Sequence, residues 1–453
     1  MNSARTVYEG RVQIRVQGRA DTDNAVRRTR FRLGYLVSHP IQYQAPMLRY
    51  IAQDPDIDLN VLYMSDMSVQ GFHDPQFKTQ VKWDVPLLGG YDHTVLGRLG
   101  GPKVTPLLRP LVVGLRDVLR RARLDALWLH GYKHQVQLRA ISAARQLRIP
   151  ILVRGESNGA EHGLKDKASA QVLRWLFRKF DAFLYIGQRN RGFYADRGVE
   201  DARLFSMPYA VDNSAFQRAA KEAAASRTEL LGSLNIQAGS TVILYAAKLT
   251  SGKRPLDLLA AYRRVVSRFS PGSEPYLVYV GDGEERRPLQ QFIDDLGLKR
   301  VRVTGFVNQS QLPRYYDLCD VFVLPSQRDR WGLAVNEVMN AGKAVIVTDQ
   351  VGCAPDLVQE GENGFVVPVG DVSGLASRLS RLVEDSALRA SMGTASRQLV
   401  ANFSFEQDLR GLKQALHQVC GSRTRVTRTS DVARYSPPAP PDVLLARGTR
   451  HDA

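Results

Sequence analysis

Short apolar runs alternate along the chain with longer segments in which apolar residues recur at helical spacing. The runs are continuous instead of alternating with polar residues, which is typical of strands buried on both faces of a parallel sheet. The predicted strands span residues 32–37, 59–64, 126–130, 150–154, 182–187, 204–208, 242–247, 276–281, 300–304, 321–325, 344–348 and 365–369. The helices predicted between the first six strands span residues 44–53, 109–123, 134–147, 166–180 and 188–197. This alternation predicts an α/β fold.

The strands fall into two series of similar length, which predicts two Rossmann-like domains that face one cleft. We expect these domains to cover residues 31–210 and 211–400, with a final helix over residues 401–420. Residues 1–30 are predicted to be a flexible leader, and residues 421–453 a disordered tail rich in Arg and Pro. Open parallel sheets bind ligands beyond the carboxyl ends of their strands, so the loops there are the candidate site.

The composition changes this picture little but excludes several classes of protein. A chain of 453 residues with 44% hydrophobic and 24% charged residues is globular, so global disorder is excluded. We find no apolar run long enough to span a bilayer and no apolar signal core at the N-terminus. The three cysteines are too few for a disulfide framework, which favours a reducing cytosol.

The net charge is +17, and the leader and tail contribute only +4 and +3 of it. The body is therefore basic, which suits polyanions, phosphorylated small molecules or an anionic membrane face. A nucleic-acid partner is not expected, because the sequence carries neither a zinc-ligand spacing nor an RNA-binding signature.

The segment at residues 325–347 carries candidate chemistry. A helix is predicted to begin at Leu333, directly after Gly332, and its unpaired amides and positive dipole end suit a diphosphate. Asp329 precedes this helix and Glu337 lies about one turn into it, so two carboxylates flank the amides. Carboxylates accept hydrogen bonds from sugar hydroxyls. For this pair alone a simpler interpretation stays open: one loop acid, and one helix acid that complements the dipole.

Further candidates follow the preceding strands of the second series. Lys248 and Lys253 lie in the segment AAKLTSGKRP, after a buried strand, where two ammonium groups can neutralise a diphosphate. Gly283 belongs to GDGEE at the end of the next strand and permits a close backbone approach. Taken singly, loop lysines are usually only solvated, and a lone Gly-x-Gly is a weak signal.

Taken together, six segments carry a family resemblance. The ordered set AAKLTSGKRP, GDGEE, VTGFV, VFVLPS, DRWGLAVNEVMNAGKAVIVTD and GENGFVVPVGD resembles the donor-binding half of family 4 retaining glycosyltransferases. The resemblance implies the GT-B architecture, with the acceptor on the first domain, the donor on the second, and the final helix crossing back to the first. It also implies transfer of a sugar from a nucleoside diphosphate sugar, with retained configuration and without a metal.

The resemblance assigns roles to the matching residues. Lys248 and Lys253 stand where the family has its diphosphate-binding Arg and Lys, and Lys248 keeps the charge but loses bidentate recognition. Asp329 and Glu337 match the two acids of the Glu-x7-Glu motif, which contact the transferred sugar and the ribose respectively. Asp329 is one methylene shorter than the usual Glu. We do not interpret this change as loss of activity.

The first half offers fewer signals. His130 ends a buried strand, where the family often has a histidine close to the reacting sugar; a histidine satisfied at a strand end is an equally good interpretation. Arg154 and Glu156 follow the next strand and are expected to point into the cleft, as acceptor-binding groups or a general base. His39, after the first strand, is a further acceptor-side candidate. Residues 71–93 are interpreted as a long loop near the acceptor side.

Two basic amphipathic stretches, residues 109–124 and 167–180, suit docking on anionic lipid, although wet sheet-covering helices explain them as well. The sequence and the family resemblance together predict a cytoplasmic, metal-independent retaining hexosyltransferase without a cofactor, and association with the cytoplasmic face of the membrane stays open. Its donor is a UDP-sugar, or second a GDP-sugar, and its acceptor is a glycan or lipid-linked glycan of surface polysaccharide or glycolipid synthesis. The alternative is a catalytically silent sugar-nucleotide sensor or scaffold of the same fold.

Overall fold

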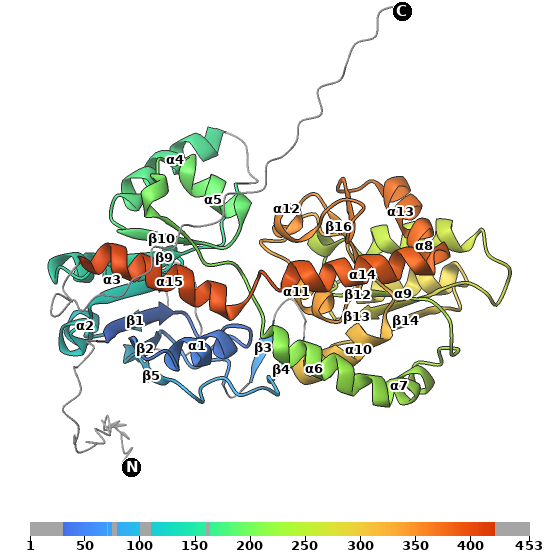
Figure 1. The fold of residues 1–453 in the computed structure, drawn as a ribbon, viewed down its shortest axis with the longest axis horizontal. Coiled ribbons are helices and arrows are strands. Elements are labelled where there is room, and N and C mark those ends of the chain that lie inside the picture. The colour runs from blue at the N-terminus through green and yellow to red at the C-terminus, as the bar shows by residue number, and fades with distance from the viewer. Residues whose placement is uncertain (1–29, 70, 75–78, 100–109, 160–163, 422–453) are drawn as a thin grey trace, which may run out of the picture.

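The structure is a computed structural model, and it describes residues 30–69, 71–74, 79–99, 110–159 and 164–421. The leader and tail predicted from the sequence lie outside these residues, apart from Arg30 and Gly421. The described chain forms two α/β units side by side, each built on one parallel sheet (Figure 1).

The first sheet has seven parallel strands in the order β11-β10-β9-β8-β1-β2-β5. These strands are β1 (Phe31–Val37), β2 (Ile57–Tyr63), β5 (Asp92–Val95), β8 (Ala126–His130), β9 (Ile151–Arg154), β10 (Ala182–Tyr185) and β11 (Leu204–Ser206). The helices of this N-terminal domain are α1 (Gln44–Ala52), α2 (Leu115–Ala122), α3 (Gln135–Gln146), α4 (Leu164–Phe177) and α5 (Gln188–Ala195). The central strands are apolar on both faces because helices cover both sides.

The second sheet has six parallel strands in the order β14-β13-β12-β15-β16-β17. These strands are β12 (Val242–Ala246), β13 (Tyr276–Val280), β14 (Val301–Val303), β15 (Val321–Leu324), β16 (Ala344–Thr348) and β17 (Gly364–Val367). The helices of this C-terminal domain are α6 (Asn213–Ala223), α7 (Arg227–Ser233), α8 (Pro255–Val266), α9 (Arg286–Asp295), α10 (Leu312–Leu318), α11 (Leu333–Asn340), α12 (Ala354–Leu357), α13 (Val372–Glu384) and α14 (Ser386–Val400). Two strand-helix series therefore form two Rossmann-like domains, as predicted.

The last helix, α15 (Phe405–Cys420), lies against the N-terminal domain. It follows α14 of the C-terminal domain and contacts β10, β11 and α1 (Figure 1). The chain thus passes between the domains after β11 and returns before α15. The domain limits at residues 210 and 400 stay predictions.

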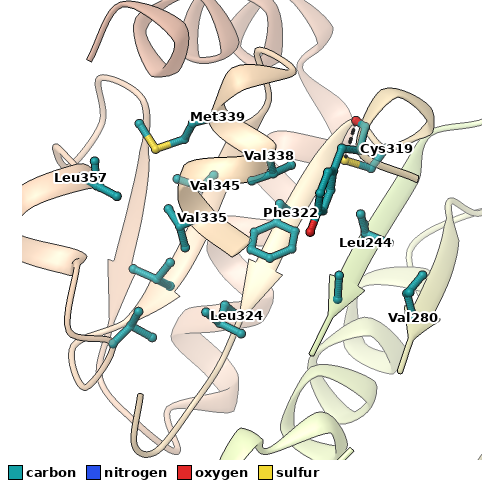
Figure 2. Close-up of a cluster of buried hydrophobic side chains, with 14 of the residues drawn as sticks. Leu244, Val280, Cys319, Phe322, Leu324, Val335, Val338, Met339, Val345 and Leu357 are labelled. Atoms are coloured by element: carbon teal, nitrogen blue, oxygen red, sulfur yellow. Dashed lines mark hydrogen bonds between the residues drawn. The ribbon is translucent and has the colours of Figure 1, made fainter. Parts of the chain in front are cut away.

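The hydrophobic core of the C-terminal domain fixes the helix that matters most for the site. Val335 and Val338 of α11 lie beside Phe322 of β15, in a cluster of buried side chains (Figure 2). The opposite face of the same sheet carries a second buried cluster. Because α11 is apolar along the side that meets the sheet, its N-terminal end is held at the carboxyl end of β15.

The structure differs from the sequence prediction in two places. Residues 71–93 are not one loop: β3 (Phe72–Asp74) and β4 (Thr79–Val81) pair antiparallel, and β5 adds a parallel edge strand. These strands are short and polar, so they lack an apolar signal. The helix predicted over residues 109–123 begins only at Leu115, because Gly114 has a φ of 69°, and Leu111–Val112 form β7, which pairs with β6 (Arg98–Leu99).

Candidate functional site

A cavity of about 520 Å³ lies where the carboxyl ends of strands from both sheets meet. Its C-terminal-domain wall follows β12, β13 and β15, and its N-terminal-domain wall includes residues that follow β1 and β9. The charged and aromatic residues that line it are Tyr43, Trp83, Glu156, Tyr209, Lys248, Lys253, Phe306, Tyr316, Arg328, Asp329, Arg330, Trp331 and Glu337. Ligand sites at the carboxyl ends of parallel strands are expected in open α/β sheets.

The N-terminal end of α11 opens into this cavity. Gly332 precedes the helix with a φ of 93°, and a Cβ atom there would lie 2.7 Å from Val351 Cγ1, so both the conformation and the space require glycine. Gly332 and Leu333 line the cavity, as the sequence predicted for the helix start. The first amides of a helix have no intrahelical partner, and together with the dipole they favour an anion.

Lys253 and Asp329 form an ion pair at the same end of the cavity. Lys253 ends a short turn at residues 251–253, and Gln327 N donates to Gly252 O at 2.9 Å, which joins that turn to the loop after β15. Asp329 N donates to Gln350 O at 3.3 Å, so the loop is also fixed on its other side. Lys253, which the resemblance assigns to the diphosphate, and Asp329, which it assigns to the transferred sugar, therefore lie in direct contact.

Lys248 is paired with a carboxylate of the other domain. Its Nζ lies 3.0 Å from Oδ2 of Asp74, at the end of β3. The glycine beside it that lines the cavity is Gly281, where a Cβ atom would lie 1.9 Å from Ala247 O. Gly283, which the sequence singled out, is two residues further on and does not appear in that lining.

Glu337 is a buried carboxylate on the cavity wall, with 7% of its surface exposed. It accepts hydrogen bonds from the Tyr316 hydroxyl and, at 3.2 Å, from Gln309 Nε2. Burial raises the pKa of Glu337, although these two hydrogen bonds act in the opposite direction. A carboxylate has up to four acceptor positions, so Glu337 can accept further hydrogen bonds from a ligand's hydroxyl groups.

Glu156 occupies the N-terminal-domain side of the cavity. It accepts hydrogen bonds from the hydroxyls of Tyr209 and, at 3.4 Å, Tyr43, and its Oε2 lies 3.2 Å from Arg330 Nη1. Burial alone would raise the pKa of Glu156, but the neighbouring His130, the Tyr209 hydroxyl and the Arg330 charge together lower it. Glu156 is therefore a permanent anion near neutral pH and is poorly suited to donate a proton.

His130 stands behind Glu156 and is not among the residues that line the cavity. Its Nε2 lies 3.8 Å from Glu156 Oε1 and 3.1 Å from Gln44 Nε2, while its buried Nδ1 has no hydrogen-bond partner. His39 Nδ1 lies 2.9 Å from Ser38 Oγ, and burial, with the charges of His130 and His134, lowers the pKa of His39 to about 4. Neither histidine is therefore among the residues that line the cavity.

Arg154 corrects a sequence prediction, because it does not point into the cleft. Its side chain is fully buried, and Nη2 donates to the carbonyl oxygens of Met207, at 3.0 Å, and Pro208, at 2.9 Å. The same nitrogen lies 3.6 Å from Asp408 Oδ1 on α15. Along a strand, side chains two residues apart point to the same face, so Arg154 and Glu156 would point the same way if the strand continued to residue 156. Strand β9 ends at Arg154, so the two side chains take different directions.

Sequence reasoning missed several residues that the fold brings to the cavity, among them Tyr43, Trp83, Tyr209 and Arg330. Arg330 is adjacent to Asp329 and could have been noticed, but Tyr43, Trp83 and Tyr209 stand in segments without a motif. Among the residues that the structure describes, no group of three or more His, Cys, Asp or Glu side chains is arranged to hold a metal ion.

Comparison with known proteins adds to this geometry. Residues 226–399 match the family model described as Glycosyl transferases group 1. The C-terminal domain is a group 1 glycosyltransferase domain. This agrees with the family resemblance read from the six sequence segments.

Two curated relatives are similar to part of this chain. The N-acetyl-alpha-D-glucosaminyl L-malate synthase of Bacillus anthracis is 27% identical over 173 residues, which are 38% of this chain and 44% of the relative. The lipopolysaccharide core biosynthesis glycosyltransferase LpsE of Rhizobium meliloti is 32% identical over 176 residues, which are 38% of this chain and 48% of the relative. The chain thus spans about half the length of these curated relatives.

Solved structures align over a longer part of this chain. Anabaena Alr3699/HepE in complex with UDP and glucose has a TM-score of 0.64 at 18% identity, covering 85% of this chain and 99% of that chain. A glycosyltransferase from Rickettsia africae has a TM-score of 0.67 at 13% identity, covering 87% and 99%. At this identity the likeness shows the fold, which is the GT-B architecture predicted from the sequence.

Proposed function

We propose that this protein is a retaining glycosyltransferase that moves a hexose from a nucleoside diphosphate sugar to a glycan or lipid-linked glycan. One observation carries the proposal. A single cavity gathers two lysines, a helix N-terminus and two acids from the C-terminal domain, and it also contains a half-buried carboxylate of the N-terminal domain. An activated sugar has an anionic centre between two hydroxyl-bearing ends, and this order of charges matches it.

Lys248 and Lys253, with the first amides of α11, hold the diphosphate in this proposal. The diphosphate gains negative charge as its bond to the sugar breaks, and fixed cations and amides in a closed site stabilise that charge without reorganising. Lys253 is paired with Asp329 in the structure, so its ammonium group is already directed into the cavity. The lysines supply the charge that a divalent metal supplies in other transferases, so the reaction is expected to proceed in the presence of a chelator.

Glu337 accepts the ribose hydroxyls, and Asp329 orients the transferred sugar. His130 does not line the cavity, so in this proposal it acts on the sugar only through Glu156, whose Oε1 lies 3.8 Å from His130 Nε2. Glu337 lies five residues after Gly332, which is about 7 Å along the helix axis. This distance places the proposed ribose contact beyond the helix start, where the diphosphate is proposed to bind. Retention of configuration fits departure and attack on one face of the sugar, with a diphosphate oxygen accepting the proton of the acceptor hydroxyl. Glu156 is held as an anion and contributes charge to the acceptor side without exchanging that proton.

The nucleotide is expected to be UDP first and GDP second. Solved structures of HepE, which shares the fold, are described with UDP and with UDP-glucose. The acceptor is placed in surface polysaccharide or glycolipid synthesis, since LpsE is named for lipopolysaccharide core biosynthesis. Cys319, Cys353 and Cys420 form no disulfide bond in the described part of the chain, and the reducing, cytoplasmic setting expected from the sequence is kept in this proposal.

A peripheral membrane contact is part of this proposal and rests on α4. Trp175 and Val172 on this helix are 60% and 64% exposed, and Arg174 and Arg178 beside them are also exposed. Apolar side chains among cations suit an anionic lipid surface. No helix in the described part of the chain has the length and apolarity needed to cross a bilayer. Sedimentation with phosphatidylglycerol vesicles, but not with phosphatidylcholine vesicles, is expected, and Trp175→Ala should weaken it.

A donor screen tests the proposed function. Purified protein is incubated with labelled UDP-hexoses and GDP-hexoses, and hydrolysis, transfer and thermal shift are scored with and without a chelator. Turnover of at least one donor, insensitive to the chelator, is expected. A thermal shift without hydrolysis or transfer would instead support the silent sensor, and loss of activity with the chelator would refute metal independence.

A further inference from the structure

Trp83 lines the cavity but has no role in the proposed transfer reaction. Trp83 comes from the N-terminal domain, in the segment between β4 and β5, yet it lines the cavity together with residues of the C-terminal domain. Its ring centroid lies 6.2 Å from that of Phe306, and the two ring planes are tilted by 60°. Phe306 follows β14, so this aromatic pair is formed by two different domains.

Both neighbours of Trp83 are bonded to the loop that carries Phe306. Asn308 Nδ2 donates to Lys82 O at 2.7 Å, and Ser310 N donates to Asp84 Oδ1 at 3.2 Å. The Ser310 hydroxyl donates to the other carboxylate oxygen of Asp84. The backbone on each side of Trp83 is therefore fixed across the domain boundary, which positions the indole ring on the cavity wall.

The same loop marks the far end of the proposed donor. Gln309 lies between Asn308 and Ser310 in the sequence, and its side chain donates to Glu337 at 3.2 Å. If the diphosphate lies at the start of α11 and the ribose at Glu337, the nucleobase continues toward this loop. The lining there is aromatic and apolar: Trp83, Phe306, Val307 and Leu312. Lys253 is instead paired with Asp329 just before the helix start, so this lysine and the aromatic residues stand at different parts of the cavity wall.

We propose that Trp83 stacks on the base of the bound nucleoside diphosphate, so that the N-terminal domain completes the base site of the C-terminal domain. The inference rests on the proposed function. A planar base can stack on one ring and meet the edge of the other, a geometry that aromatic groups favour. Stacking tolerates any base because every base has a π face, so Trp83 supplies affinity and leaves the choice of base to polar groups.

The site has a consequence for the order of binding. Because one ring of the aromatic pair belongs to the N-terminal domain, a nucleotide gains full stacking only when the two domains meet as they do here. Binding of the base and approach of the domains are therefore coupled, and a ligand without a base does not share this coupling.

The test compares ligands with and without a base. Calorimetry measures the affinity of wild type, Trp83→Ala, Trp83→Phe and Phe292→Ala for UDP, GDP and inorganic pyrophosphate. Phe292 is an aromatic residue of α9 that is 49% exposed and remote from the cavity lining, so it controls for loss of an aromatic side chain. Trp83→Ala is expected to lose about tenfold in affinity for the preferred nucleotide and none for pyrophosphate, while Trp83→Phe recovers most of the loss.

The outcomes separate the two proposals. Wild type that binds no nucleoside diphosphate would refute the proposed function itself. Wild type that binds one, with Trp83→Ala binding equally well, would overturn the role of Trp83. Equal losses for nucleotide and pyrophosphate would also overturn it, since they would indicate general damage to the site. Circular dichroism and thermal melting of each variant identify any that fail to fold, and Trp83→Phe then carries the test.

Discussion

The ammonium group of Lys248 lies 3.0 Å from the carboxylate of Asp74, and this ion pair joins the C-terminal domain to the N-terminal domain inside the proposed diphosphate site. Asp74 is buried at 8% exposure, whereas the Lys248 side chain is 28% exposed. A bound diphosphate would bring further negative charge to the same ammonium group. Asp74 therefore competes with the ligand for Lys248.

Replacing Asp74 tests this competition. Asp74→Asn should bind UDP severalfold more tightly, because the diphosphate no longer meets a neighbouring carboxylate, and the gain should shrink as salt is added. Calorimetry at two ionic strengths measures it. Asp92→Asn, an exposed position on β5, is the matched control and should bind as wild type does. Weaker binding by Asp74→Asn would show that the carboxylate organises Lys248 and does not compete.

Lys253 is expected to matter for turnover more than for folding. Lys253→Ala should lower kcat by about 10²–10³-fold, since it removes one fixed cation from the departing diphosphate. Lys299→Ala is the control, because Lys299 is an exposed residue before β14. Steady-state kinetics at saturating donor gives the comparison. An unchanged kcat would refute the role, whereas a raised KM alone would mean that Lys253 binds donor and transition state equally.

Glu337 should show opposite effects on stability and on binding. Burial raises the pKa of Glu337, so its charged form costs stability in the unliganded protein, and Glu337→Gln should raise Tm. The same change should weaken UDP binding about tenfold or more, since hydrogen bonds to a charged acceptor are the stronger ones. Thermal melts with and without UDP measure both. A variant that is less stable and binds UDP normally would contradict the ribose assignment.

Asp408 gives the fold a pH dependence. Burial raises the pKa of Asp408 to about 7 despite the Arg154 charge, and neither of its buried oxygens has a hydrogen-bond partner. The folded protein then holds this proton more tightly than the unfolded chain, so stability falls as pH rises from about 4 through 7. The loss is up to about 4 kcal/mol.

Urea unfolding between pH 5 and pH 8 checks this slope. Asp408→Asn should flatten the decline in unfolding free energy and be the more stable protein at pH 8. Asp295→Asn, at an exposed position on α9, should keep the wild-type slope. If the free energy of unfolding changes with pH equally in Asp408→Asn and in wild type, a group other than Asp408 causes the pH dependence.

The sequence predicted the C-terminal domain well because its signals are local. Buried parallel strands give continuous apolar runs, and α11 begins at Leu333 as expected because Gly332 and the apolar spacing both mark its start. The edge elements β3, β4 and β5 carry no such run, so they were interpreted as a loop. Of the predicted site, Lys248, Lys253, Asp329 and Glu337 lie around one cavity, while their roles stay predictions.

The rest of the site depends on long-range contacts that no single sequence displays. Asp74 and Lys248 are 174 residues apart, and Asn158 and Asp329 are 171 apart, yet each pair is in contact. Arg154 was expected in the cleft because it follows a strand, but a side chain's direction is set by where the chain turns after the strand. Such pairings follow from how two domains face each other, which periodicity does not encode.

Arg154 also bears on how the two domains of the protein can move relative to each other. Its guanidinium holds the outgoing chain at Met207 and Pro208 and stands 3.6 Å from Asp408 on the returning helix. The two chain segments that connect the domains, after β11 and before α15, are thus both next to the same buried guanidinium group at their N-terminal-domain ends. A change in the angle between the two domains would then fall on the backbone of residues 209–212 and 401–404. Rotation of one domain about these two segments is therefore expected to be easier than sliding of one domain along the other.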